Sequence, residues 1–165
     1  MFDYLKRILL GAEPPAHQEG DHTEGNKDQK VNRLQLATCA LFVEMAKADD
    51  HFSEQERESI IKHMKQKFNL EDEAVTELIE LSEKKAEQSV SIYEFTSVIN
   101  EYFSREEKFE LLKNLWHLIF LDKKLSAYED QLIKKIGATL NIEHRDIISA
   151  KLLVKEEINS VNNKS

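Results

Sequence analysis

Apolar residues recur along most of this chain at intervals of three and four, which is the spacing of one face of an α-helix. The pattern predicts seven helices, over residues 28–48, 53–67, 71–87, 91–103, 105–121, 127–139 and 143–158. No segment shows the two-residue alternation of a half-buried strand. The expected fold class is therefore all-α, and residues 31–158 are expected to form a single helical domain.

Two of the predicted helices carry more apolar residues than one buried face needs. In the helix over 28–48, Leu36, Ala40 and Val43 widen the apolar stripe, so this helix should be buried on more than one side. The helix over 105–121 is the most apolar and should lie at the centre of the second half. Cys39, the single cysteine, lies among small apolar residues and is expected to be a buried hydrophobe.

The first thirty residues have a different composition. Residues 1–10 place apolar side chains on one helical face, with Lys6 and Arg7 elsewhere, which predicts a short amphipathic segment. Two interpretations stay open for it: peripheral contact with a membrane surface or a partner, or a terminus that folds back onto the domain or frays. Residues 11–30 contain both prolines and three of the four glycines, which predicts a flexible linker.

One sequence frame occurs twice in the domain. Residues 48–56 and 121–129 share an Asp, an apolar residue three positions on, a Ser at four and a Glu at seven, with a constant offset of 73 residues. The repeat predicts two pseudo-symmetric halves. In each half a helix should end near the Asp, a tight corner should follow, and the next helix should begin at the Ser.

The Ser and Glu of this frame have the spacing of a capping box, in which the Ser side chain and the Glu carboxylate satisfy each other's backbone amides at a helix start. Ser53 with Glu56 and Ser126 with Glu129 fit this signature. The same spacing occurs outside the repeat, at Ser91/Glu94 and Ser104/Glu107. Capping is therefore a sufficient explanation for Glu56 and Glu129, although it leaves a further role open.

The repeated Asp needs another explanation, because Asp49 and Asp122 fall at predicted helix C-termini, where the helix dipole disfavours an anion. One interpretation is an Asx-type turn, in which the carboxylate accepts backbone N–H groups. The other is a ligand for a hard cation such as calcium or magnesium, which binds several converging oxygens. The loop is not an EF-hand, since the Asp-x-Asp-x-Asp-Gly register and a Glu at the twelfth position are missing.

The first of the two corners is the more acidic. Glu44 precedes Asp49 by five residues, and six carboxylates fall within residues 44–58. In the second corner His117 takes the place of Glu44, and two lysines follow Asp122. Any cation is therefore expected at the first corner. His117 is expected to be an interior histidine, and His63 and His144 to lie on helix surfaces without an arranged partner.

Composition narrows the class of function. A net charge of −8 argues against nucleic acid as a partner. The chain has no Gly-rich phosphate loop, nucleophile elbow, His-Glu-x-x-His or cysteine cluster, so it is not expected to be an enzyme. No apolar run approaches the roughly 20 residues that span a bilayer, and the N-terminus lacks the features of a secretory signal. The expected location is the cytoplasm.

Residues 45–56 (MAKADDHFSEQE) and 115–129 (LWHLIFLDKKLSAYE), with IYEFT at 92–96 between them, resemble the tellurite-resistance protein B-like (TerB-like) family of bacteria. The resemblance covers about residues 31–155. It implies an all-helical domain of two related halves, with a role in stress response, metal-ion binding or scaffolding and without catalytic activity. The family's acidic positions fall on five residues of this sequence, Glu44, Asp49, Glu56, Asp122 and Glu129.

The sequence departs from the family pattern in two respects. The residue after each Asp is usually Gly in the family, whereas here it is Asp50 or Lys123. The counterpart of Glu44 in the second half is His117. Both departures favour a site at the first corner over two equivalent sites.

The leading hypothesis is a non-enzymatic module that senses or buffers a divalent cation, calcium or magnesium rather than zinc, at Glu44, Asp49 and Glu56. It would pass this signal on through an unidentified partner protein. The alternative is a protein interaction module without a metal site, whose acidic corners cap helices or contact a basic partner. A hydrolase using the carboxylates as acid and base is disfavoured, because no nucleophile is apparent.

Overall fold

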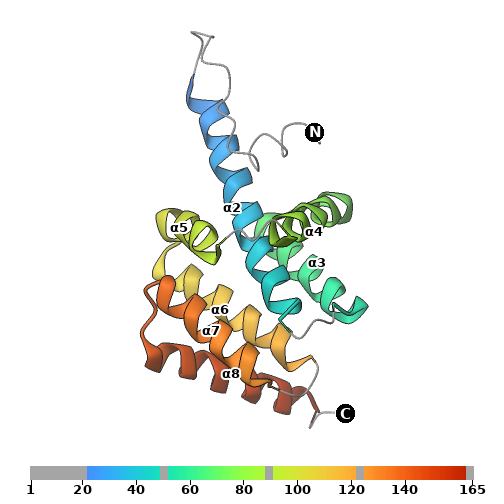
Figure 1. Ribbon diagram of the computed structural model, residues 1–165, viewed down its shortest axis with the longest axis vertical. Coiled ribbons are helices and arrows are strands. Elements are labelled where there is room, and N and C mark those ends of the chain that lie inside the picture. Colours follow the sequence, from blue (N-terminus) through green and yellow to red (C-terminus); the bar gives the residue numbers. More distant parts are fainter. Residues whose placement is uncertain (1–21, 49–51, 88–90, 122–124, 163–165) are drawn as a thin grey trace.

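A computed structural model describes residues 22–48, 52–87, 91–121 and 125–162 of the chain. Helices account for nearly all of this part, and no strand occurs in it, so the predicted all-α fold class is confirmed (Figure 1). The helices are α2 (His22–Ala46), α3 (Glu54–Phe68), α4 (Asp72–Glu87), α5 (Ile92–Tyr102), α6 (Arg105–Phe120), α7 (Ala127–Thr139) and α8 (His144–Asn162). The amphipathic segment predicted over 1–10 lies outside the described residues.

Helix α2 is the element around which the others pack. It contacts α3, α4, α5, α6 and α7, and Figure 1 shows it entering the domain between α5 on one side and α3 and α4 on the other. Every residue from 35 to 43 is buried, including Cys39, Leu41 and Val43 with no exposed surface. The prediction that this helix is buried on more than one side is therefore confirmed.

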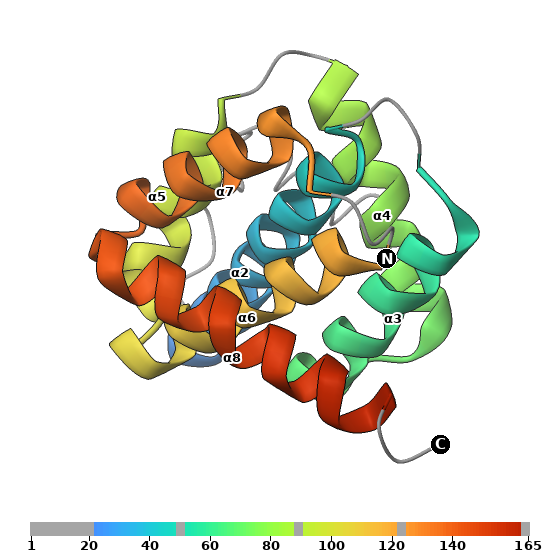
Figure 2. The same ribbon diagram turned by 90° about the horizontal axis from the view of Figure 1, so that it is seen from below.

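Helix α6 is central to the second half of the chain, as its apolar sequence predicted. It packs against α8, α7, α2 and α3, and Figure 2 shows α8 crossing it. Trp116 of α6 is fully buried, and its Nε1 donates a hydrogen bond of 3.2 Å to the backbone oxygen of Ile147 in α8. This bond satisfies the single polar group of a large buried side chain and ties the two helices together.

The linker predicted over 11–30 is wrong in its second part, because α2 already begins at His22. Residues 22–30 have no apolar periodicity, which is why the sequence pattern placed the helix start near residue 28. Extending a helix that is already anchored costs little, since each added residue gains a backbone hydrogen bond without a new nucleation step. The buried part of α2 supplies that anchor.

Two asparagines adopt the left-handed conformation. Asn69 ends α3 with φ 54° and ψ 48°, and its N–H donates to the oxygen of Lys65. Asn141, in the turn between α7 and α8, has φ 60°. Asn tolerates this region better than most residues, which explains why it occupies both positions. The relation of the two halves in space stays a prediction.

Candidate functional site

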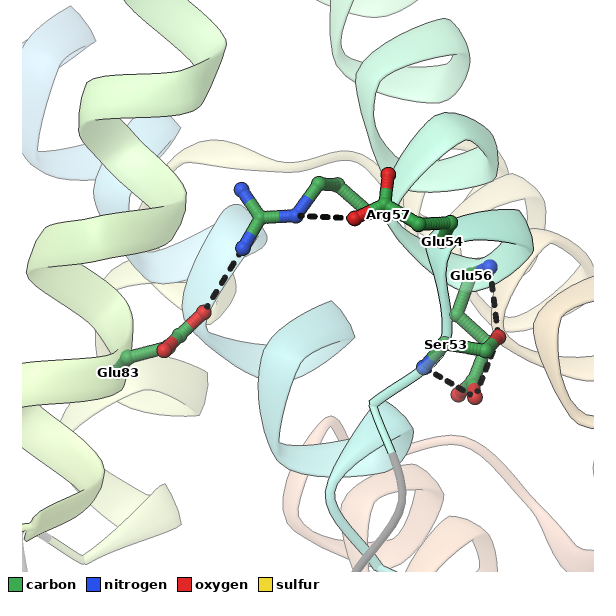
Figure 3. A network of polar contacts seen from close by, with 5 residues as sticks. All are labelled: Ser53, Glu54, Glu56, Arg57 and Glu83. Atoms are coloured by element: carbon green, nitrogen blue, oxygen red, sulfur yellow. Dashed lines mark hydrogen bonds and ion pairs between the residues drawn. The ribbon is translucent and has the colours of Figure 1, made fainter.

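The first corner is described from residue 52 onward, and its Ser and Glu form the predicted capping box. The Ser53 hydroxyl accepts from the N–H of Glu56 at 3.2 Å. Glu56 Oε1 in turn accepts from the Ser53 N–H at 3.2 Å and from the Ser53 hydroxyl at 3.0 Å (Figure 3). Glu56 is only 4% exposed, so its carboxyl group is buried as well as capping the helix.

Arg57 connects this corner to α4. Its guanidinium lies 3.5 Å from Glu83 Oε1 on α4 and 4.0 Å from Glu54 Oε1 on its own helix (Figure 3). The same guanidinium lies over the ring of Phe52 at 5.4 Å, a cation–π distance. These contacts hold the start of α3 against α4, so the position of Glu56 is supported from two elements.

Glu44 lies in the last turn of α2 and is half-buried. Burial raises the pKa of its carboxyl group above the ordinary value, and the nearby positive charge of Lys47 partly opposes this effect. A carboxylate in such surroundings gains more from a nearby cation than one in bulk water. Asp49, the third residue predicted for the first corner, lies outside the described residues.

The second corner repeats the cap on α7. Ser126 donates its N–H to Glu129 Oε1 at 3.1 Å, and its hydroxyl accepts from the Glu129 N–H at 3.1 Å. Glu129 is 6% exposed, so this carboxylate is also buried. Asp122 lies outside the described residues. The capping interpretation is therefore confirmed for Glu56 and Glu129 alike.

Capping boxes form at three of the four predicted positions. Ser104 and Glu107 make the third, at the start of α6. At α5 the Ser91 side chain accepts from the N–H of Tyr93 and not from that of Glu94, so the fourth prediction is wrong. The sequence signature alone does not show whether the capping Ser side chain accepts from the N–H of the second or of the third helical residue.

Of the predicted acidic residues, the structure describes Glu44, Glu56 and Glu129. Within the ranges that the structure describes, no group of three or more His, Cys, Asp or Glu side chains is arranged to hold an ion. Glu44, Glu56 and Glu129 therefore form no such group among themselves. Asp49 and Asp122 lie outside those ranges.

Two histidines differ from their predicted surroundings. His117 was expected in the interior, yet its side chain is 31% exposed and its Nε2 lies 3.0 Å from Glu157 Oε2. His63 was expected to have no arranged partner, yet its ring stacks on Phe42 at 5.8 Å and lies 6.3 Å from the ring of His117. These residues come from α2, α3, α6 and α8, so no local sequence signal could have grouped them.

The described residues thus define an all-helical domain with buried glutamates capping two of its helices. The family model "Tellurite resistance protein TerB" matches residues 35–152, and the chain belongs to this family. The match covers α3 to α7 entirely and parts of α2 and α8. Comparisons with curated proteins and with solved structures gave no match.

The family assignment confirms the resemblance seen in the repeated frame. TerB domains are helical and generally non-catalytic. In the described part of the chain, no helix is long and apolar enough to cross a membrane.

Proposed function

We propose that this chain is a non-enzymatic module of tellurite-related stress response that binds a divalent cation at its first acidic corner. Glu44, Asp49 and Glu56 would supply the oxygen ligands, and a protein partner would receive the signal. Calcium and magnesium are the expected ions, because an all-oxygen ligand set suits hard cations better than zinc.

The burial of Glu56 is the observation that supports this proposal most. A buried carboxylate is costly unless hydrogen bonds or an opposite charge compensate it. Ser53 contributes its N–H and hydroxyl, both to Oε1. A carboxylate can keep such bonds while an oxygen also ligates a cation, so capping and ligation are compatible roles.

Glu44 adds a second argument. Its raised pKa shows that its surroundings disfavour the isolated negative charge. A divalent cation nearby would lower this pKa by stabilising the charged form. Asp49, three residues after the end of α2 in the sequence, would then provide a third carboxylate, at a place where the dipole of that helix would not favour an anion.

The second candidate is an interaction module without a metal site. The complete capping boxes at Ser53/Glu56 and Ser126/Glu129 favour it, since they give both buried glutamates a structural role. In that case the acidic surface around the corners would contact a basic partner. Peripheral membrane contact through residues 1–10 would belong to either candidate.

Calorimetric titration with calcium, magnesium, manganese and zinc separates the two candidates. The cation proposal predicts saturable binding for the wild type, loss of binding for Asp49→Asn, and retained binding for Asp122→Asn as the matched control. The weakest calcium sites in proteins have dissociation constants of about 1 mM. Absence of heat and of any rise in melting temperature at about that metal concentration would favour the interaction module instead.

A further inference from the structure

Residues of α3, α6 and α8 line a groove of about 910 Å³. Figure 2 shows how these three helices are arranged. Small-molecule sites in proteins have volumes of about 300–1,000 Å³, so the groove is large enough for a metabolite. None of Glu44, Glu56 and Glu129 is among its described lining residues. The groove is therefore distinct from the acidic corners.

The groove carries positive charge in a chain whose net charge is −8. Its described lining includes Lys62, Lys113 and Lys155, one from each helix, against Glu110 and Glu157. Both glutamates pair with Lys113, whose Nζ lies 3.0 Å from Glu157 Oε1 and 3.9 Å from Glu110 Oε1.

The other two lysines differ from Lys113. Within the described ranges, neither Lys62 nor Lys155 forms an ion pair with a carboxylate. The Lys155 ammonium instead lies 5.7 Å from the ring centre of Phe120. Two ammonium groups that line the groove, one on α3 and one on α8, thus remain available to an anionic ligand.

The imidazole of His63 lines the same groove beside Lys62 and His117. Burial, together with the positive charges of His117 and Lys62, lowers the pKa of His63 from 6.5 to about 4. A group that is pushed towards its neutral form by nearby positive charges marks a place where an added anion would be stabilised.

We propose that this groove binds a small organic anion, a phosphate or carboxylate group attached to an apolar body. Lys62 and Lys155 would hold the anionic group. Phe120, Leu121 and Ile158 line the same groove and offer an apolar surface for the remainder of the ligand. His63 and His117 lie beside the anionic group as hydrogen-bonding neighbours.

Titration with phenyl phosphate, followed through the ring proton resonances of His63 and His117, tests this proposal on the full chain. Saturable shifts of both resonances are expected, with weaker binding of inorganic phosphate, which lacks the apolar body, and no comparable binding of phenol, which lacks the charge. Lys62→Glu should weaken binding about tenfold or more, the effect expected for losing one charge-assisted hydrogen bond.

Lys135→Glu is the matched control. Lys135 lies on α7, 73 residues after Lys62, is exposed, and does not line the groove, so this variant makes the same change in net charge elsewhere. Binding should change less than about twofold, because charges beyond about 10 Å are screened at ordinary ionic strength. The proposal is overturned if neither histidine responds at about 10 mM ligand, if phenol binds as well as phenyl phosphate, or if both lysine variants weaken binding equally.

Discussion

Gly137 is a single residue on which the contact between α7 and α8 depends. A Cβ at this position would lie 2.5 Å from Ile147 Cδ1 and 2.8 Å from Cγ1, and Ile147 is itself 2% exposed. Ala is ordinarily the better helix former by about 1 kcal/mol, but here the overlap should reverse the sign. Gly137→Ala should lower the free energy of unfolding by about 1–3 kcal/mol in urea denaturation.

A second substitution checks that this steric explanation is right. Ile147→Val removes Cδ1, so the combination with Gly137→Ala should cost less than the two single changes added together. A Gly137→Ala variant more stable than the wild type would contradict the close contact between the two helices.

His63 should make stability depend on pH. Its pKa is lowered from 6.5 to about 4 in the folded chain, first by burial and then by His117 and Lys62. Below about pH 6.5 the unfolded chain therefore binds a proton that the folded chain does not bind until about pH 4. The stability present at pH 7 should fall by about 2–3 kcal/mol as the pH drops through this window.

Thermal or urea unfolding of His63→Gln between pH 7 and pH 4 measures this contribution against the wild type. The variant should have the shallower pH dependence, because it lacks the titrating group. His144→Gln, at an exposed position on α8, should keep the wild-type dependence. If the stability of the wild type and of His63→Gln changed equally with pH, His63 would not be buried as described.

At the scale of elements, the start of α3 combines a structural with a proposed functional role. Glu56→Ala removes the acceptor for the Ser53 N–H and should cost about 1–2 kcal/mol of stability. Glu56→Gln keeps a carbonyl acceptor of the same shape, so it should cost less than Glu56→Ala, while it removes the charge that a cation requires.

Glu107 provides the comparison for these variants. It closes the capping box of α6 at a less buried position, where Lys67 lowers its pKa by hydrogen bonding. Glu107→Gln should leave metal binding unchanged. Chemical denaturation measures the stability of Glu56→Ala, Glu56→Gln and Glu107→Gln, and metal titration measures their metal binding. Unchanged metal binding in Glu56→Gln would contradict a ligand role for Glu56.

Helix positions were predictable from the sequence where the signals are local. Ser53, Ser104 and Ser126 begin helices because each has a Glu three residues later, and Asn69 ends one because it tolerates a positive φ. The extension of α2 back to His22 was not predictable, since polar residues without periodicity carry no sign of a helix that buried residues downstream stabilise.

At the scale of the whole molecule, the groove could not be predicted. His63, His117 and Glu157 are separated by 40 residues or more along the chain and meet only because α8 crosses α6 (Figure 2). The local pattern around His117 is apolar, which suggested an interior position. Its neighbours, Glu157 on α8 and His63 on α3, are brought to it by the packing of the whole domain.

Deletion of residues 1–21 should leave the domain folded. The buried core begins at Leu36, and the family match begins at residue 35. The melting temperature of the truncated chain should therefore stay within about 2 °C of that of the full chain, which corresponds to less than about 1 kcal/mol. A larger drop would show that the N-terminal segment packs on the domain.

The same deletion tests membrane contact. If residues 1–10 bind a membrane surface, the full chain should sediment with vesicles containing anionic lipid and the truncated chain should not. Equal sedimentation of the two chains would exclude these residues as an anchor.

The cation proposal is tested most directly by a calcium titration followed through the backbone amide resonances. The account predicts saturable shifts at Ser53 and Glu56, with smaller shifts at Ser126 and Glu129, because the second corner has lysines where the first has acidic or neutral residues. Asp49→Asn should abolish the shifts at the first corner. Unperturbed amides at Ser53 and Glu56 up to about millimolar calcium, the weak end of known sites, would contradict a calcium site there.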